Sequence, residues 1–459
     1  MEASRLKLID ALRLNLDARL ALVGAGGKSS ALFRIGRELS AIDECAVREV
    51  WLSASTHLSS DQLQLADHAV ELNEPSDFYH YLESPTNGLV LFTGPPVENE
   101  RSAGLTPSLM MELKLQADLL GIPVILEADG SRRLPLKAPA GHEPVIPEWV
   151  NQVVVVAGLS ALGKPLTHEW VHRPEIFSEL SGLSLGEPVT GEAIAAVLGS
   201  SNGGLKGIPE HARRILLLNQ ACSDEQKAAG QWIASQLQDV YHAIVLANLQ
   251  PPLGEGKILA VYERVAGVVL AAGCSKRLGR PKQLLMWRNH PLVYHAASIA
   301  LHSGLKPVIV ITGYAADDVA RAIESLPVLV VENPNWKAGQ GASVASSIEA
   351  LPEEVGAAVF FLSDQPLVPS ELVHGLLASH AESLSPIVAP LVNGRRSNPV
   401  LFDRKLFPEL SQLSGEQGGR VLFSRYPVKW IDWVSDNVDL DVDTEQDYQR
   451  LLTVDNNEL

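Results

Sequence analysis

The sequence predicts an α/β protein made of two three-layer domains in tandem. Short apolar runs alternate with amphipathic stretches along the whole chain, which is typical of parallel sheets covered by helices on both faces. Two of the apolar runs lead directly into glycine-rich loops, which indicates two separate starts of such a fold. The length of 459 residues also exceeds what one hydrophobic core ordinarily organises.

The expected strands fall into two series, with helices between them. The first series is Leu20–Val23, Val50–Ser53, Leu89–Phe92, Val124–Glu127, Val153–Ala157 and Ile215–Leu218. The second series is Val265–Leu270, Pro307–Thr312, Val328–Val331, Ala358–Leu362 and Ile387–Pro390. Helical patterns cover, for example, Lys28–Ser40 and Pro291–Ser303. Ligand sites are expected at the carboxyl ends of the strands.

The two domains are expected to meet in the segment from Leu249 to Gly267. It contains a Pro-Pro pair and two glycines, followed by a short helix-like stretch. We therefore place the boundary near residue 260, with domains at residues 1–258 and 259–459. The first domain is interpreted as P-loop-like, because its glycine loop ends in Gly27-Lys28-Ser29, and the second as Rossmann-like.

Composition narrows the classes of function. A net charge of −17 argues against a general nucleic-acid binder but allows small anionic ligands held by backbone amides and a few cations. The cysteines, Cys45, Cys222 and Cys274, are far apart, which suits a reducing cytoplasm. The N-terminal segment is unlike a signal peptide, and no apolar run reaches the roughly 18 residues of a membrane span. We expect a soluble, cytoplasmic protein without nucleic-acid or membrane partners.

The second glycine-rich loop reads LAAGCSKRLGRPKQLL, from Leu270 to Leu285. A glycine directly after a buried strand allows a ligand to approach the backbone closely. We expect this loop to contact the phosphates of a nucleotide, with Arg277 and Lys282 neutralising their charge. The alternative is a solvated basic turn before a helix. The candidate nucleotide-binding residues of the loop are Leu270, Ala271, Ala272, Gly273 and Ser275.

Carboxylates suited to a divalent cation occur further along the chain. Asp364 ends the apolar run in FLSDQPLV, and Asp441 and Asp443 lie in LDVDTEQDY. Mg²⁺ prefers oxygen ligands and usually takes only one or two carboxylates, so Asp364 is the first candidate and Asp441 or Asp443 the second. The alternative for the late aspartates is a solvated acidic segment with a helix cap.

These motifs resemble the nucleotidyltransferases of molybdenum-cofactor maturation (the MobA-like NTP transferases), and most closely the molybdenum cofactor cytidylyltransferases. That family's loop pattern is LAAGxSxRxGxxKxLL, and every fixed position matches here. Leu278 stands where Met is usual before the second glycine. The resemblance continues through Asn333–Ile348, in which it implies that Asn333, Gly341 and Ser343 help to hold the nucleotide. NGRRSNPVLF carries Ser397-Asn398 where Gly-His is common, a departure near the expected acceptor contacts.

The resemblance implies transfer of CMP from CTP to the terminal phosphate of molybdopterin, with Mg²⁺ and release of pyrophosphate. The LAAG sequence, rather than LAGG, favours CTP over GTP. Two alternatives remain open. One is a nucleotidyltransferase using GTP or another acceptor, such as a sugar phosphate. The other is a non-catalytic chaperone that holds the finished molybdenum cofactor.

The first glycine-rich loop, LVGAGGKSSALF, also follows a strand and opens a helix. Its candidate phosphate-binding residues are Gly24, Gly26, Gly27, Lys28 and Ser29. The spacing is shorter than the full G-x-x-x-x-G-K-[ST] pattern, so a glycine turn with a capped helix is the alternative.

An apolar strand ends in Glu127 and Asp129, where a carboxylate for a second metal is expected, with Asp129 as the candidate ligand. Arg132, Arg133 and Lys137 follow. This part of the chain, about residues 15 to 245, resembles YqeC-like accessory proteins of selenium-dependent molybdenum hydroxylases. The resemblance implies binding of ATP or GTP and a molybdenum hydroxylase as recipient of the cofactor.

The sequence HEWVH, from His168 to His172, fits the HExxH pattern of zinc proteases. That chemistry requires both histidines on one continuous helix. Pro165 and Pro174 leave little room for a helix, so we expect a polar loop near the nucleotide instead. His57 and His142 have no evident partner in the sequence, and structural roles are expected for them.

Overall fold

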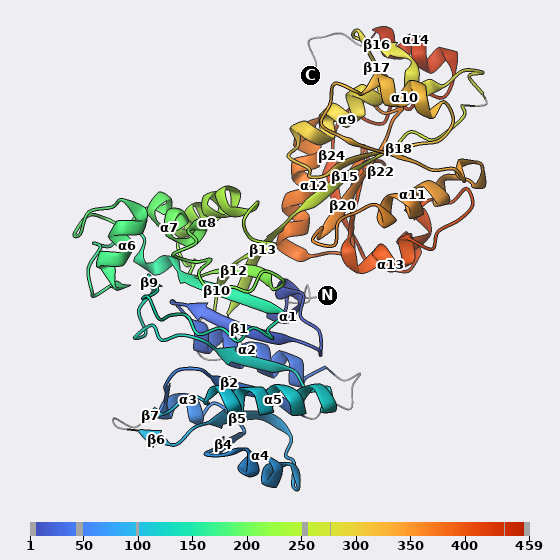
Figure 1. The fold of residues 1–459 in the computed structure, drawn as a ribbon. Coiled ribbons are helices and arrows are strands. Elements are labelled where there is room, and N and C mark those ends of the chain that lie inside the picture. The colour runs from blue at the N-terminus through green and yellow to red at the C-terminus, as the bar shows by residue number, and fades with distance from the viewer. Residues whose placement is uncertain are drawn as a thin grey trace. The chain divides into compact units, whose positions relative to one another are not determined.

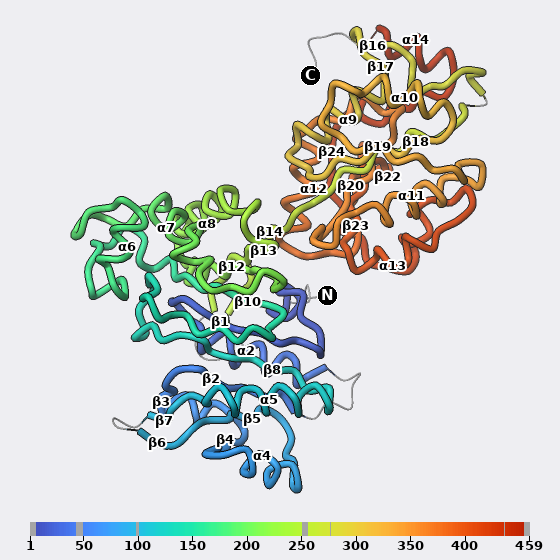
Figure 2. The backbone as a smooth tube through the Cα atoms, viewed as in Figure 1, coloured from blue at the N-terminus to red at the C-terminus, as the bar shows by residue number. Residues whose placement is uncertain are grey.

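The computed structural model describes residues 6–42, 49–97, 101–249, 256–275, 277–435 and 437–453. The chain forms two compact units, Met1–Tyr262 and Glu263–Leu459 (Figures 1 and 2). Each unit contains a large sheet with helices packed against it, so the α/β class and the two-domain layout expected from the sequence are both found. None of the described helices combines the length and the hydropathy that crossing a bilayer would require.

The first unit is built on a sheet of nine described strands in which each strand from β13 to β4 pairs in parallel with its neighbours. In sheet order the strands are β14 (Lys257–Glu263), β13 (Ala243–Asn248), β12 (Arg213–Asn219), β10 (Gln152–Gly158), β1 (Arg19–Gly24), β8 (Val124–Glu127), β2 (Glu49–Ala54), β5 (Gly88–Thr93) and β4 (His68–Glu71). All six strands of the first expected series are present, and β1 lies near the centre.

Helices cover both faces of this sheet (Figure 1). They are α1 (Leu8–Leu12), α2 (Lys28–Ser40), α3 (Ser60–Leu63), α4 (Pro75–Leu82), α5 (Pro107–Leu120), α6 (Pro174–Ser181), α7 (Gly191–Gly199) and α8 (Asp224–Leu237). Gly36 of α2 packs against Leu52 and Leu89, and a side chain at that position would clash with them. On the face of the sheet opposite to α2, Val23 of β1 lines a pocket together with residues of α6 and α7.

Short strands complete the first unit at its loop-bearing edge. One small sheet joins β3 (Leu58–Ser59), β7 (Arg101–Ser102) and β6 (Pro96–Val97), and a second joins β9 (Leu136–Lys137) and β11 (Val171–His172). These strands are only two residues long, so they fix the loops that carry polar side chains rather than add to the core.

The prediction of a helix-like stretch in the join between the domains is wrong. The residues form strand β14, which pairs with β13 at the edge of the first sheet. The residues of KILAVYE are mostly half-buried, with Ala260 and Val261 buried, which fits a strand at the edge of a sheet. The two units divide at the end of this strand, between Tyr262 and its last residue, Glu263.

The second unit is built on a mixed sheet. In sheet order its strands are β19 (Leu329–Glu332), β18 (Val308–Thr312), β15 (Val265–Leu270), β20 (Ala357–Leu362), β23 (Val400–Asp403), β21 (Ile387–Val392) and β22 (Arg395–Arg396), and β24 (Val428–Trp433) also pairs with β21. The order β19-β18-β15-β20 is Rossmann-like, with a reversal of chain progression between β15 and β20.

The second sheet is not parallel throughout, since β23 runs antiparallel to both β20 and β21. β21 continues into β22 through a tight turn at Asn393-Gly394 and then into β23. So short a connection returns the chain in the opposite direction, because a parallel partner needs a long crossover.

Helices enclose the second sheet on both faces as well. They are α9 (Leu292–His302), α10 (Ala316–Ala322), α11 (Gln340–Glu349), α12 (Ser370–Ser383), α13 (Phe407–Leu410) and α14 (Glu445–Thr453). A small hairpin of β16 (Met286–Trp287) and β17 (His290–Pro291) precedes α9. Val268 and Val269, neighbours on β15, belong to separate buried clusters, which shows the two hydrophobic layers of a three-layer unit.

Candidate functional site

The candidate site of the second unit lies where β15 and β20 end. Leu270 and Leu362 are register partners in these parallel strands, so the loops that follow them emerge at the same edge. This is the point at which the order of the strands reverses, the usual ligand position in open α/β sheets. The basic loop follows β15 and Asp364 follows β20, as the sequence motifs require.

The loop after β15 is held in shape by its own polar side chains. Ser275 has a positive φ of 52°, and its Oγ accepts a hydrogen bond from the backbone amide of Lys282 at 3.0 Å. The buried Gln283 donates to the carbonyls of Ala271 and Gly273, at 3.2 and 3.0 Å. Sequence reasoning missed Gln283, whose buried amide folds the loop back onto the strand end.

Lys282 is the centre of the charged cluster. Its Nζ donates to Asp364 and, at 2.7 Å, to Asp443. Burial alone would lower the pKa of Lys282, but the two carboxylates outweigh it and raise that pKa, so the lysine is protonated. Arg277 also reaches Asp443, at 3.1 Å. Residues from three distant parts of the chain therefore meet at one point.

Asp441 lies beside this cluster, close enough for the charges of Asp364 and Lys282 to act on it. Gln365 donates a hydrogen bond to its carboxylate. Protein atoms packed around the carboxyl group, and then the neighbouring Asp364 carboxylate, raise the pKa of Asp441 to about 6, although the residue as a whole is exposed. By contrast, the hydrogen bond from Lys282 lowers the pKa of Asp443. The raised pKa of Asp441 therefore reflects burial of its carboxyl group first and the neighbouring Asp364 carboxylate second.

The carboxylates of this cluster are of the kind that a divalent cation such as Mg²⁺ takes as ligands. Asp364, Asp441 and Asp443 supply the hard oxygen ligands that Mg²⁺ prefers, and Lys282 occupies the space among them. In the described part of the chain, no group of three or more His, Cys, Asp or Glu side chains is arranged so that it could hold a metal ion. Mg²⁺ usually takes one or two carboxylates together with substrate phosphates.

Asn333, Gly341 and Ser343 lie next to this edge of the sheet but are buried. Asn333 and Ser343 are 1% and 4% exposed, and the amide of Asn333 donates to the Ser343 hydroxyl at 3.0 Å. A Cβ on Gly341 would come within 2.8 Å of the backbone of Ser414, so this glycine lets α11 pack closely. Direct contact of these three residues with a nucleotide stays a prediction.

A pocket beside the site carries residues that sequence reasoning passed over. It has a volume of about 70 Å³, and its lining includes Leu270 and Leu362 at the strand ends together with Arg396, Arg420 and Phe423. The Arg396 guanidinium lies 4.6 Å from the centre of the Phe423 ring. Burial, and then the charge of Arg420, lower the pKa of Arg396. The positive charges of Arg396 and Arg420 repel each other. An anionic ligand between the two guanidinium groups would relieve this repulsion, so the pocket favours such a ligand.

A larger cleft, about 920 Å³ in volume, lies in the first unit, where the loop after β1 meets the start of α2. Gly26, Gly27, Lys28 and Ser29 line it, as the sequence predicted for a phosphate loop. Further lining residues that sequence reasoning did not assign include Gln62, Arg101, Arg132, Arg133, Arg173 and Asn219. Asn219 is almost fully buried, donates to the Gly26 carbonyl at 2.7 Å and so fixes the loop.

Gly24 and Asp129 lie away from this cleft. Gly24 has φ of +93°, and a Cβ there would meet the carbonyl oxygen of Val156 at 2.2 Å. Its amide donates to both carboxylate oxygens of Asp129, at 3.1 and 3.0 Å. Asp129 is 2% exposed and pairs with Lys28 at 3.1 Å and with Lys137 at 2.8 Å. The Asp129 carboxylate therefore forms the centre of a buried ion-pair cluster.

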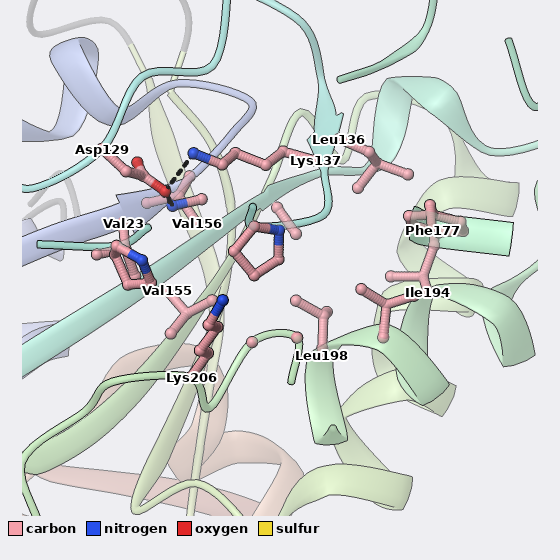
Figure 3. A pocket seen from close by; sticks show the side chains of 17 residues that line it. Val23, Asp129, Leu136, Lys137, Val155, Val156, Phe177, Ile194, Leu198 and Lys206 are labelled. Atoms are coloured by element: carbon pink, nitrogen blue, oxygen red, sulfur yellow. Dashed lines mark hydrogen bonds and ion pairs between the residues drawn. The ribbon is translucent and has the colours of Figure 1, made fainter. Parts of the chain in front are cut away.

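Gly24 and Asp129 instead line a second, smaller pocket of about 30 Å³. Figure 3 shows the Asp129–Lys137 pair at one side of it, with Phe177, Ile194 and Leu198 facing it from the other side. The pocket is largely apolar apart from this pair and Lys206, which donates to the carbonyl of Ala140. The ion pairs of Asp129 are thus shielded on this side by apolar packing.

The HEWVH segment forms no helix. His168 lies in a turn and His172 on the two-residue strand β11, so the two rings lack the spacing of a zinc protease helix. Both line the large cleft, and His168 contacts Glu175 at 2.8 Å. Partial burial, followed by three neighbouring cations, lowers the pKa of His172 to about 4. His57 lines the same cleft and His142 is exposed, so neither has the buried structural role expected for it.

Comparison with known families and proteins agrees with this division of the chain. Residues 267–430 match the model of the MobA-like NTP transferase domain, and residues 20–175 match that of the YqeC protein. A solved structure, the Rv0371c protein of Mycobacterium tuberculosis H37Rv, is 32% identical, with a TM-score of 0.37 over 41% of this chain and 97% of that one.

Three curated relatives are similar over most of their own length. Nicotine blue oxidoreductase of Paenarthrobacter nicotinovorans is 35% identical over 41% of this chain and 96% of the relative. The uncharacterized protein YqeC of Escherichia coli is 30% identical over 50% of this chain and 87% of the relative. A probable molybdenum cofactor guanylyltransferase of Bacillus mycoides is 28% identical over 40% and 94%. The chain joins a YqeC domain to a MobA-like NTP transferase domain and belongs to both families.

Proposed function

We propose that the second unit is a molybdenum cofactor cytidylyltransferase, which transfers CMP from CTP to the terminal phosphate of molybdopterin. The observation that carries the proposal is the meeting of Lys282, Arg277, Asp364 and Asp443 at the carboxyl ends of β15 and β20. Nucleotidyl transfer depends on positioning and on neutralising phosphate charge, and this cluster supplies both cations and metal-binding oxygens.

The reaction needs no oxidant and balances as a displacement at phosphorus. An oxygen of the acceptor phosphate attacks the α-phosphorus of CTP, and the bond to the β-phosphate breaks with release of pyrophosphate. Lys282 and Arg277 hold the charge of the phosphates, while Asp364 with Asp441 or Asp443 would hold Mg²⁺. When bound, Mg²⁺ neutralises charge that develops on the phosphate oxygens.

The acceptor belongs in the pocket beside the strand ends. Arg396 and Arg420 line it together with the aromatic ring of Phe423, which suits a ligand with a phosphate group and a flat ring system. The departure Ser397-Asn398 lies in the same lining, so these residues take part in the choice of acceptor.

The first unit is proposed to bind a nucleoside triphosphate, ATP or GTP, and to act as the accessory domain in maturation of a molybdenum hydroxylase. The start of α2 with Gly27, Lys28 and Ser29 at the edge of a large polar cleft supports this part of the proposal. A molybdenum hydroxylase is the proposed recipient of the finished cofactor.

Pyrophosphate release tests the assignment of the second unit. Purified protein is supplied with Mg²⁺ and molybdopterin, and CTP is compared with GTP and ATP. We expect release with CTP, and a fall of about 100-fold or more in Asp364→Asn. Asp317→Asn, at the exposed start of α10, is the matched control. Release with GTP instead would assign the guanylyl reaction, and tight cofactor binding without release from any nucleotide would assign the chaperone.

A second candidate function is favoured by the most identical of the relatives named above, nicotine blue oxidoreductase. The same protein preparation is therefore tested for oxidation or reduction of nicotine blue. Turnover of that compound without pyrophosphate release would replace the cytidylyltransferase assignment.

A further inference from the structure

The phosphate loop of the first unit offers fewer donors than its sequence suggests. The amides of Gly24, Ala25 and Gly26 donate to Asp129, to the Val156 carbonyl and to the Leu134 carbonyl, respectively. The Nζ of Lys28 donates to the Gly24 carbonyl at 2.6 Å. Lys28 is only 3% exposed and its ammonium group also pairs with Asp129. What remains for a phosphate is the backbone at the start of α2.

Arginines line the same cleft and can supply the missing charge. Arg132, Arg133 and Arg173 all have positive φ values, an uncommon conformation for residues other than glycine. Arg133 pairs with Asp61 and Arg173 with Glu143. Among the described residues, the side chains of Arg132 and Arg101, which both line the cleft, have neither a hydrogen bond nor an ion pair. Their charges are therefore available to a ligand at no cost in existing contacts. Of the two, Arg132 lies in the loop that follows β8 and Glu127.

A metal-binding oxygen pair also faces the cleft, at a different place from Asp129. Ser29 Oγ donates to Glu127 Oε2 at 3.3 Å, and the amide of Gln62 contacts both of these oxygens, at 2.8 and 3.0 Å. Ser29, Gln62 and Glu127 line the cleft, whereas Asp129 does not. A hydroxyl and one carboxylate, completed by phosphate oxygens and water, form a usual Mg²⁺ site beside a phosphate loop.

We propose that the cleft of the first unit binds a magnesium–nucleoside triphosphate, with the cation on Ser29 and Glu127 and with Arg132 on the terminal phosphates. Lys28, Asp129 and Lys137 form a buried ion-pair cluster that holds the loop in place. The inference rests on the proposed function of the first unit as a nucleotide-binding domain. It assigns the ligand contacts to residues other than the lysine and the aspartate that the motif singles out.

The test measures binding of AMPPNP and GMPPNP by calorimetry, with and without Mg²⁺. The full chain carries Lys282→Met, so that nucleotide binding by the second unit is impaired. Arg132→Ala is expected to weaken binding about 10- to 100-fold, the usual loss for a charged hydrogen bond. Its matched control is Arg37→Ala, an arginine of α2 that pairs with Asp67 outside the cleft.

Glu127→Gln is expected to abolish the gain in affinity that Mg²⁺ confers, while Glu179→Gln, on the exposed side of α6, retains it. Asp129→Asn is expected to keep that gain but to lower the melting temperature. Loss of the Mg²⁺ gain in Asp129→Asn, at an unchanged melting temperature, would move the metal to Asp129. Full affinity in Arg132→Ala would overturn the role of Arg132.

Two outcomes separate this inference from the functional proposals on which it rests. Binding that none of these substitutions alters would refute the contacts and leave nucleotide binding by the first unit intact. No binding of either analogue, nor of inorganic tripolyphosphate, would refute both. The proposed function of the second unit is tested separately, by measuring pyrophosphate release with the chain that keeps Lys282.

Discussion

Replacing Lys282 by methionine should have opposite effects on catalysis and on metal binding. The lysine side chain is 23% exposed, and its ammonium group touches Asp364 and Asp443. Methionine keeps the length of the side chain and removes the charge. Because the ammonium group lies among the carboxylates proposed to hold Mg²⁺, lysine and metal compete for the same oxygens before the nucleotide binds.

The size of each effect follows from these contacts. Loss of one fixed donor that stabilises charge in a transition state costs about 2.7–4 kcal/mol, so pyrophosphate release should fall by about 10²- to 10³-fold. Mg²⁺ affinity without nucleotide should rise, by about tenfold, because one charge-assisted hydrogen bond no longer has to be displaced.

Both effects are measured on the same preparation. Pyrophosphate release is followed with CTP and molybdopterin at saturating Mg²⁺, and metal binding is followed by calorimetry without nucleotide. Lys429→Met, an exposed lysine on β24, is the matched control. A variant with normal turnover and unchanged Mg²⁺ affinity would refute the assignment of this cluster as the metal and phosphate site.

Two further predictions concern buried or crowded carboxylates. The pKa of Asp441 is raised to about 6, so Mg²⁺ affinity should increase as pH rises through 6, and metal titrations of Asp441→Asn should lack this increase. In metal-free protein the pKa of Asp441 is higher in the folded state than its ordinary value of 3.8, so the protonated carboxyl group stabilises the fold. The free energy of unfolding should therefore fall as pH rises from about 4 through 6, and chemical denaturation at several pH values would check this. Asp129→Ala should lower the unfolding free energy of the first unit by about 3–5 kcal/mol in urea titrations, because Lys28 and Lys137 lose a buried partner; unchanged stability would show that the ion-pair cluster is not structural.

The strands were the most predictable part of the fold. Strands buried on both faces read as continuous apolar runs, and all eleven expected runs coincide with strands, among them β1, β8 and β20. Sequence reasoning missed other strands, among them β13, although its sequence AIVLAN is a buried apolar run. β14 was taken for a helix, while β23 and β24 follow turns and add antiparallel or late pairings that no local pattern specifies.

The candidate sites were predictable in part. The basic loop and Asp364 were predicted because both follow continuous apolar runs. The loop follows β15, and Asp364 follows β20. Arg396 and Arg420 were not singled out, since an arginine by itself carries no local sign of which cavity it lines. Gln283 was missed for a related reason, because its importance arises only from burial beneath the loop.

The sequence by itself determined the two α/β units, their glycine loops and the types of charged residue beside them, because these features depend on composition and spacing over a few residues. Only the tertiary structure decided which charges meet. Lys282 and Asp443 are 161 residues apart in sequence and 2.7 Å apart in space. Glu127 and Asp129 are two residues apart, yet Glu127 lines the cleft and Asp129 is buried in an ion-pair cluster. The chain turns after β8 ends at Glu127, so the alternation of a strand no longer governs where Asp129 points.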